Sequence, residues 1–168
     1  AQWTANGVLL GVSQDYNARV CADGTGGLLA LWSVGEGAGT NLVGNRVTAA
    51  GTNAAGWSAN GTPICSAPQF QSAQDVVSDG AGGGFFLWKD SRSGNQELYG
   101  QHMNAAGAAQ WAADGIALAT GDSGVEPLAA CDDGAGGVVT AWSGDSGLVV
   151  QRFNGAGAEQ WTAGGRTM

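Results

Sequence analysis

Basic residues are scarce in this sequence: six Lys and Arg stand against 14 Asp and Glu, so the formal net charge is −8. A nucleic-acid partner requires a basic footprint that displaces counterions from the phosphates, and the sequence has none. The acidic balance equally disfavours binding to an anionic membrane surface. No apolar run approaches the ~18 residues of a transmembrane helix. We therefore expect no nucleic-acid partner and no insertion into a membrane.

Cysteine is also rare, and the odd count of three argues against a disulfide framework. Cys21 and Cys131 occupy the slot that Val77 fills in the middle of the chain, which predicts a buried, small apolar position. Cys65 lies in a separate run, and no Cys-x-x-Cys motif occurs. The cysteines therefore predict neither a metal site nor a redox role, and we expect no cofactor.

Catalytic motifs are missing as well. The single histidine, His102, stands where Arg46 and Arg152 stand elsewhere in the chain, and this exchange predicts a strand-surface position. No Gly-x-Ser-x-Gly motif occurs, and no helix follows the Gly-rich segments to form a phosphate loop. We predict that the protein is not an enzyme. A glycosidase-like propeller enzyme, which needs two carboxylates across a sugar ring, is the distant alternative.

Helical periodicity is absent, because no apolar stripe at i, i+3, i+4 persists over three turns. Glycine, by contrast, is abundant, with 31 residues. Disordered chains are poor in aromatic residues, whereas this one has seven Trp, four Phe and two Tyr at ordered spacings. We interpret the glycines as turn residues of an all-β protein.

The dominant pattern is an internal repeat. The motif Asp-Gly-x-Gly-Gly occurs at 23–27, 79–83 and 133–137, with offsets of 56 and 54. Two tryptophan series run in step with it and include every tryptophan of the chain. The first lies five residues after each motif: Trp32, Trp88 and Trp142. The second consists of Trp3, Trp57, Trp111 and Trp161, of which the last three follow an Ala-Gly turn.

Each repeat contains four short runs of β-forming residues, bounded by Gly, Asn, Asp and Ser. In the middle repeat they predict strands at 74–78, 84–89, 97–103 and 110–119. Residues 1–168 are thus one domain of three tandem four-stranded antiparallel repeats. Their boundaries are near 13–66, 67–120 and 121–168. We expect residues 1–12 to form an extra strand that belongs to a preceding repeat or closes the assembly.

The segments 77–95 and 98–111 carry an Asp-Gly-x-Gly-Gly, Trp, Asn-Ala-Ala-Gly, Gln-Trp pattern. This pattern resembles a repeat of large secreted bacterial surface proteins, and more loosely the Asp-box and PQQ-type propeller blades. Asn104 departs from the Ser-x-Asp start of an Asp-box. The resemblance implies propeller blades in an extracellular or cell-surface protein. Since propellers have four to eight blades, three would need a homo-oligomer or neighbouring repeats of a longer chain.

A β-trefoil is the alternative fold, because it also has three four-stranded repeats. Its lectin members carry Gln-x-Trp, whereas Gln and Trp are adjacent in this chain at 2–3, 110–111 and 160–161. The extra strand at 1–12 also has no place in a trefoil. We therefore favour propeller blades.

The predicted sites are few. Trp57, Trp111 and Trp161 follow polar turns, so their rings could lie near the surface and stack on sugars. The alternative is that they join each repeat to the next. Asp122, Asp132 and Asp133 are weak calcium candidates, since hard cations need several oxygens. The first residue of each Asp-Gly-x-Gly-Gly motif is instead expected to shape its turn.

These patterns favour a non-catalytic extracellular repeat module for scaffolding, adhesion or self-assembly. A multivalent carbohydrate-binding lectin is the alternative, with one weak site per repeat and avidity from their combination. A glycan is therefore a possible partner.

Overall fold

The computed structural model describes residues 3–4, 6–11, 16–35, 39–121 and 124–168. Within these ranges every regular element is a β-strand. None of the described segments forms a helix long and apolar enough to cross a bilayer. The prediction of an all-β protein is confirmed.

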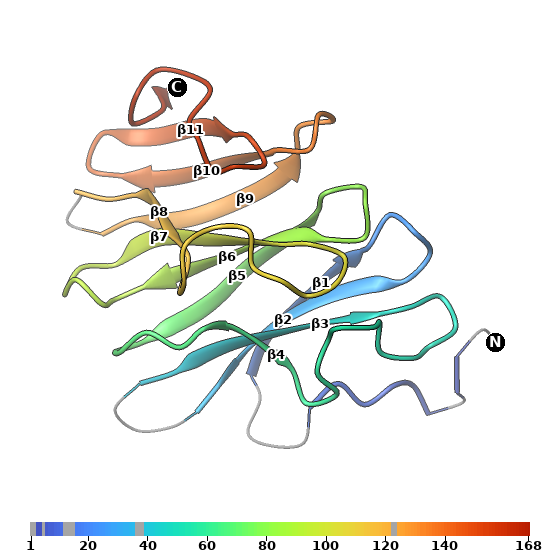
Figure 1. Cartoon of the computed structure of the whole chain (residues 1–168). Coiled ribbons are helices and arrows are strands. Elements are labelled where there is room, and N and C mark those ends of the chain that lie inside the picture. The colour runs from blue at the N-terminus through green and yellow to red at the C-terminus, as the bar shows by residue number, and fades with distance from the viewer. Residues whose placement is uncertain (1–2, 5, 12–15, 36–38, 122–123) are drawn as a thin grey trace.

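The strands form three antiparallel sheets, and in each sheet their spatial order follows the chain (Figure 1). Each sheet corresponds to one sequence repeat, so the prediction of three four-stranded antiparallel repeats is confirmed. The strands are β1 (Tyr16–Ala22), β2 (Leu28–Val34), β3 (Asn41–Val47) and β4 (Thr62–Cys65); β5 (Gln71–Ser78), β6 (Gly84–Asp90), β7 (Glu97–Met103) and β8 (Ile116–Ala119); β9 (Glu126–Asp132), β10 (Val138–Gly144), β11 (Gly147–Phe153) and β12 (Arg166–Thr167).

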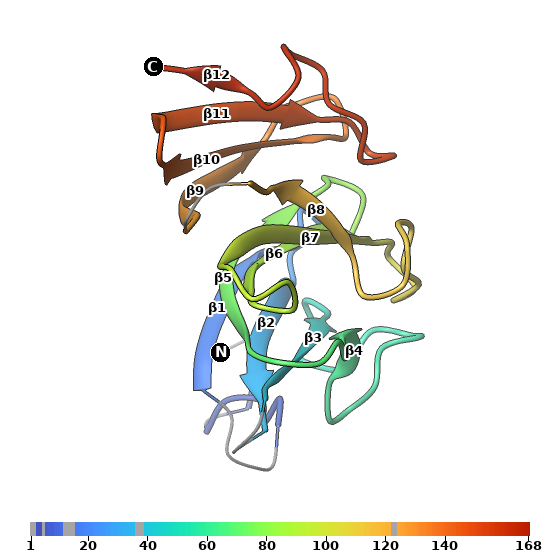
Figure 2. The same ribbon diagram turned by 90° about the vertical axis from the view of Figure 1, so that its left-hand side faces the viewer.

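The three sheets are stacked face to face (Figures 1 and 2). The β5–β8 sheet lies in the middle and is covered on both faces. The described strands pair only within their own repeat and close no barrel.

Side-chain alternation along β6 fills both layers between the sheets. Phe86 and Trp88 belong to the apolar cluster shared with the first sheet, while Phe85 and Leu87 belong to the cluster shared with the third. Successive side chains of a strand point to opposite faces, so a strand buried on both faces reads as a continuous apolar run. This explains why the segment Gly84–Asp90 is apolar through Trp88.

The turn between the first two strands of each repeat is built as predicted. Asp79 accepts hydrogen bonds at Oδ1 from the backbone N–H groups of Ala81 and Gly83, at 2.8 and 3.0 Å. Asp23 and Asp133 do the same in their repeats. Each aspartate therefore shapes a hairpin turn, as Asp side chains commonly do.

The fourth strand of each repeat is shorter than predicted. The strand predicted over 110–119 begins only at Ile116. Between Trp111 and Ile116 the chain makes a turn in which Gly115 N–H donates to the Ala112 carbonyl, and Asp114 and Gly115 take φ values of 58° and 81°. Trp111 therefore precedes the strand. Of the strand predicted over 1–12, the described residues 3–4 and 6–11 form no strand in any sheet of this chain.

We expect Phe86→Ala to lower the free energy of unfolding by about 3–5 kcal/mol. The Phe86 ring is fully buried between the first two sheets and lies 6.0 Å from the Trp57 ring, so its removal leaves a cavity. Phe70→Ala is the matched control, because Phe70 is 51% exposed and its loss should change stability by less than about 0.5 kcal/mol. Chemical denaturation of both variants measures the difference, and equal effects would contradict this packing.

Candidate functional site

The structure places two of the three candidate tryptophans in the interior. Trp57 and Trp111 are only 6% and 9% exposed, whereas Trp161 is half-buried. Trp57 and Trp111 therefore have no open ring face of the kind that stacks on a sugar.

A side chain on the third strand of the repeat holds two of these tryptophans, whereas the Trp57 N–H donates to the Ala54 carbonyl instead. Buried Gln101 on β7 accepts a hydrogen bond from the Trp111 backbone N–H at 3.0 Å and donates from Nε2 to the Ala112 carbonyl at 2.8 Å. Gln151 makes the same contact with the Trp161 N–H, at 3.1 Å. The position of the indole is thus fixed by its own sheet.

The indole N–H group reaches into the following repeat. Trp57 Nε1 donates to the Ala105 carbonyl at 3.1 Å, and Trp111 Nε1 donates to the Gly155 carbonyl at 2.9 Å. Trp3 Nε1 donates to the Ala49 carbonyl at 2.9 Å, although Trp3 has no sheet of its own. All three acceptors are the first residue of an Ala-Ala-Gly or Gly-Ala-Gly turn. We call this oxygen the turn carbonyl.

The glycine two residues after the turn carbonyl lies against the ring of that indole. A Cβ on Gly107 would stand 3.3 Å from a Trp57 ring atom, and one on Gly51 would stand 3.0 Å from a Trp3 ring atom. The φ values of Gly51 and Gly107 are 78° and 73°, a region that residues with a Cβ rarely adopt. The turn therefore needs glycine both for its backbone and for the ring.

A cationic or imidazole side chain also binds the same carbonyl. Arg46 Nη1 donates to the Ala105 carbonyl at 3.3 Å, and His102 Nδ1 contacts the Gly155 carbonyl at 3.0 Å. A carbonyl oxygen only accepts, so Nδ1 is the donor of that contact, and Nε2 can donate to Asp79 at the same time only when the ring carries both protons. The two lone pairs of the turn carbonyl thus receive two donors from the preceding sheet. We call the indole and its Arg or His partner the inter-sheet clamp.

Each Arg or His of the clamp is held by the aspartate of its own hairpin turn. Arg46 Nε lies 2.9 Å from Asp23 Oδ2, and His102 Nε2 lies 3.2 Å from Asp79 Oδ2. His102 is therefore a half-buried residue between sheets, stacked on Phe85, and not a strand-surface residue as predicted. The repeated exchange of Arg and His at one slot was the sequence signal for this shared role.

The third repeat has the same arginine and tryptophan, but neither donates to a turn carbonyl among the described residues. Arg152 Nε lies 2.7 Å from Asp133 Oδ2, so the arginine is held as in the first repeat. The hydrogen bonds of Arg152 and Trp161 within the described part of the chain include none to a turn carbonyl.

The carboxylate in the first clamp is strongly ionised. Burial raises the pKa of Asp23, but hydrogen bonds from the Thr25 side chain and backbone, from Arg46 and from Gly27 outweigh it and lower the pKa to about 2. The pKa of Asp133 is lowered in the same way, against the opposing effect of burial. These aspartates therefore act as acceptors that order the turn and the clamp.

Two of the three calcium candidates, Asp132 and Asp133, are used in turns. Asp133 accepts hydrogen bonds from its own turn at Oδ1 and from Arg152 at Oδ2. Asp132 Oδ1 accepts a hydrogen bond from the Gly134 N–H at 2.8 Å. Asp122 lies outside the described residues. Among the residues that the structure does describe, no three His, Cys, Asp or Glu side chains gather where they could hold a metal ion.

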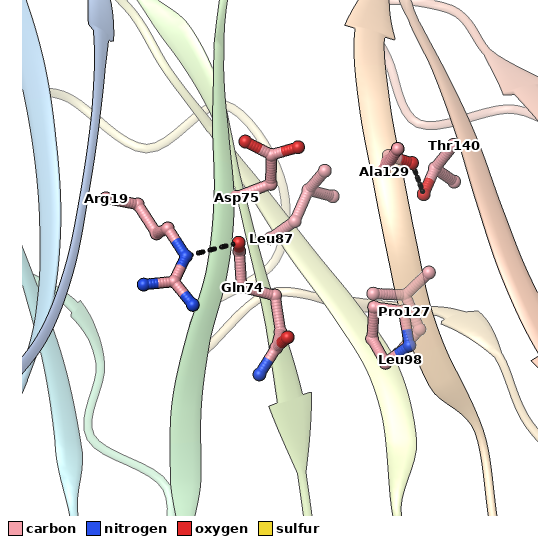
Figure 3. Close-up of a pocket in the computed structure, with 8 residues that line it drawn as sticks. All are labelled: Arg19, Gln74, Asp75, Leu87, Leu98, Pro127, Ala129 and Thr140. Carbon is pink, nitrogen blue, oxygen red and sulfur yellow. Dashed lines mark hydrogen bonds between the residues drawn. The ribbon is translucent and has the colours of Figure 1, made fainter.

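A small cavity of about 220 Å³ lies where the first strands of the three repeats approach one another. Figure 3 shows Arg19 reaching from β1 toward Gln74, with Ala129 and Thr140 on the opposite wall. Arg19 Nε donates to the Gln74 carbonyl at 2.9 Å, and Asp75 Oδ2 accepts from the Ala130 N–H at 3.0 Å. The polar groups of the cavity thus link the three sheets.

The cavity follows from a change of residue in the third repeat. Thr140 occupies the β10 position that Phe86 occupies in β6, two residues before the tryptophan. Phe86 fills the layer between the first two sheets, whereas the smaller Thr140 leaves space in front of Leu87 and Leu98. We did not predict this cavity from the sequence, although the substitution was visible in the aligned repeats.

The cysteine slot behaves differently in each repeat. Val77 is buried, Cys21 is half-buried and Cys131 is exposed, so the prediction of a buried position holds only for part of the stack. Burial raises the pKa of Cys21 and of Cys65 to about 11. Both thiols therefore stay protonated near neutral pH, and a protonated thiol is a poor nucleophile.

No protein-family model matches this chain, and no curated protein matches it in sequence. The site is therefore interpreted from its own geometry.

We expect Trp57→Phe to lower the free energy of unfolding by about 1 kcal/mol or more, because the variant keeps a ring but loses the hydrogen bond to the Ala105 carbonyl. Trp161→Phe is the matched control and should have little effect, since its indole N–H has no carbonyl partner among the described residues. Urea denaturation measures both values. A loss at Trp161 as large as that at Trp57 would contradict the clamp.

We expect Asp23→Asn to lower the free energy of unfolding at pH 7 by about 2 kcal/mol. The pKa of Asp23 is lowered from 3.8 to about 2, and each unit corresponds to about 1.4 kcal/mol of stabilisation by the ionised form. The carboxylate stabilises the fold above its unfolded pKa, and this contribution is lost as the pH falls through about 2. The difference between wild type and variant should therefore shrink below pH 4. Denaturation curves from pH 7 to pH 2 test this, and a constant difference would argue against an ionised clamp.

Proposed function

We propose that this chain is a non-catalytic repeat module of propeller-type blades, which serves scaffolding, adhesion or self-assembly at the cell surface or outside the cell. One observation carries the proposal: the same clamp joins the first sheet to the second and the second to the third. An interface repeated in this way serves to align successive units. The extracellular location rests on the resemblance to repeats of secreted bacterial surface proteins.

The arrangement of the first strands supports propeller-type blades. β1, β5 and β9 each begin a sheet and lie side by side, linked through Arg19 to Gln74 and through Asp75 to Ala130 (Figure 2). In a propeller, four-stranded sheets surround a central channel. Three sheets whose first strands converge are what a partial ring of blades would present.

The apolar layers support a scaffold role. Both layers between the sheets contain buried aromatic and aliphatic side chains, and the middle sheet is buried on both faces. In stacked repeat proteins each unit contacts only its neighbours, so stability is approximately a sum over units and interfaces. Such a stack presents loops at fixed intervals, which is the property that a scaffold or an adhesion module requires.

A lectin function would have to depend on Trp161 among the three candidate tryptophans. Its ring is half-buried, and the Arg166 guanidinium lies 5.7 Å from the ring centroid. Binding to a glycan array that disappears in Trp161→Ala would support this alternative.

We expect a fourth repeat to fold when it is fused in register after the third. Met168 lies seven residues after Trp161, as Ile64 does after Trp57, so a copy of residues 65–120 placed after Met168 keeps the register. The added sheet should receive the clamp of Arg152 and Trp161. The denaturant m-value should then rise with the additional buried surface, and the exposed Cys131 should react more slowly with a thiol reagent.

Mass spectrometry of the labelled protein identifies the reaction at Cys131, and limited proteolysis reports whether the added repeat is folded. A fused segment that is cleaved at once, with Cys131 still fully reactive, would show that these sheets do not form an extendable array.

A further inference from the structure

The third sheet presents a clamp whose two donors are already in place. Asp133 orients Arg152, and Gln151 holds the backbone of Trp161, as their counterparts do in the second repeat. In the first two repeats the equivalent Arg or His and indole N–H donate hydrogen bonds to the turn carbonyl of the next sheet. The ligand that this clamp fits is therefore a backbone carbonyl at the start of an Ala-Ala-Gly-type turn.

The apolar face beside this clamp is also uncovered. Leu148 pairs with the residue after a repeat tryptophan, as Leu42 and Leu98 do. Leu42 and Leu98 are fully buried by the following sheet, whereas Leu148 is 41% exposed. Cys131 is exposed at the slot where Val77 is buried. The third sheet thus has the surface of a sheet that another sheet covers.

The first sheet offers the complementary surface. Val20 is 64% exposed, while Val76, at the same slot of the second repeat, is 3% exposed because the first sheet covers it. From the described residues the Ala49 carbonyl accepts one hydrogen bond, from Trp3, whereas the turn carbonyls of Ala105 and Gly155 each accept two. The Arg or His donor is the partner that Ala49 does not receive from the described residues.

We propose that a second copy of this chain docks its first sheet on the third sheet of the first copy, with Arg152 and Trp161 of one copy binding the Ala49 carbonyl of the other. In this contact Trp161 takes the place of Trp3, and Arg152 supplies the second donor. The proposal rests on the proposed function, of which it names the partner and the contact. Trp3 is then a latch that occupies the acceptor turn within a single chain.

The latch sets how strongly the copies associate. Trp3 belongs to the same chain as its acceptor, so it competes at a high effective concentration with the Trp161 of another copy. The net charge of −8 on each copy adds repulsion between them. The wild-type chain should therefore associate weakly, and loss of the Trp3 side chain should strengthen the association.

Sedimentation equilibrium of the full chain, in about 0.15 M salt to screen the charge, tests the proposal. We expect Trp3→Ala to lower the dissociation constant between copies by about tenfold or more, since each 1.4 kcal/mol of competing interaction corresponds to a factor of ten. Adding Trp161→Ala or Arg152→Ala to Trp3→Ala should remove this gain. Arg152→His should retain it, because His102 performs the same role in the second repeat.

The rate of Cys131 labelling gives a second, independent measurement, because the docked copy covers the face that carries Cys131. In Trp3→Ala the labelling should slow as protein concentration rises, and with Trp161→Ala added it should not. Circular dichroism confirms that each variant is folded, which is expected since Trp3 and Trp161 are only half-buried. A Trp3→Ala chain that stays monomeric, or one that associates equally well without Trp161, would overturn the proposal.

The fused-repeat experiment separates this proposal from the function on which it rests. If the fused repeat folds and Trp3→Ala stays monomeric, the repeat array stands and docking of a second copy is wrong. If Trp161-dependent association occurs while the fused repeat does not fold, the docking surface stands and the extendable array is wrong.

Discussion

The turn carbonyl is the point on which the stacking of this protein depends. It lies at the end of the third strand of one sheet and receives an indole N–H and an Arg or His side chain from the sheet before. This contact sets the close approach of consecutive turns, the need for glycine beside the ring and the burial of Trp57 and Trp111. The apolar layers supply most of the stability, because hydrophobic burial is the dominant favourable term in folding. Since this burial is non-directional, the clamp is the contact that fixes how the sheets are aligned.

Position in the stack decides what equivalent residues do. Val77, Cys21 and Cys131 share one slot and differ in exposure, and Leu98 and Leu148 share another. The local sequence around each slot is similar between repeats, but the sheet that packs against the slot differs. No fourth sheet of the described residues covers the third, and Leu148 and Cys131 on its outward face are exposed in this structure.

Most of the fold could be predicted from the sequence. The repeats, the hairpin aspartates and the first three strands of each repeat follow from local turn chemistry and alternation, which act over a few residues. The fourth strand was predicted too long, because the turn at 112–115 depends on contacts with the third strand. The burial of Trp57 and Trp111, the role of His102 and the cavity beside Thr140 depend on the following or preceding sheet. Such contacts join residues about 50 positions apart, beyond the reach of local patterns.

The acceptor in each clamp is a backbone carbonyl, so the two sheets of an interface have different sequence requirements. One sheet must supply a tryptophan, an Arg or His and an aspartate, whereas the other must supply only a turn with glycine at its third position. The residue that bears the acceptor is Ala in two repeats and Gly in the third. Sequence drift at that residue therefore leaves the contact intact. The clamp by itself therefore tolerates diverged repeats as acceptors, whereas the apolar layers still depend on the residues of each repeat.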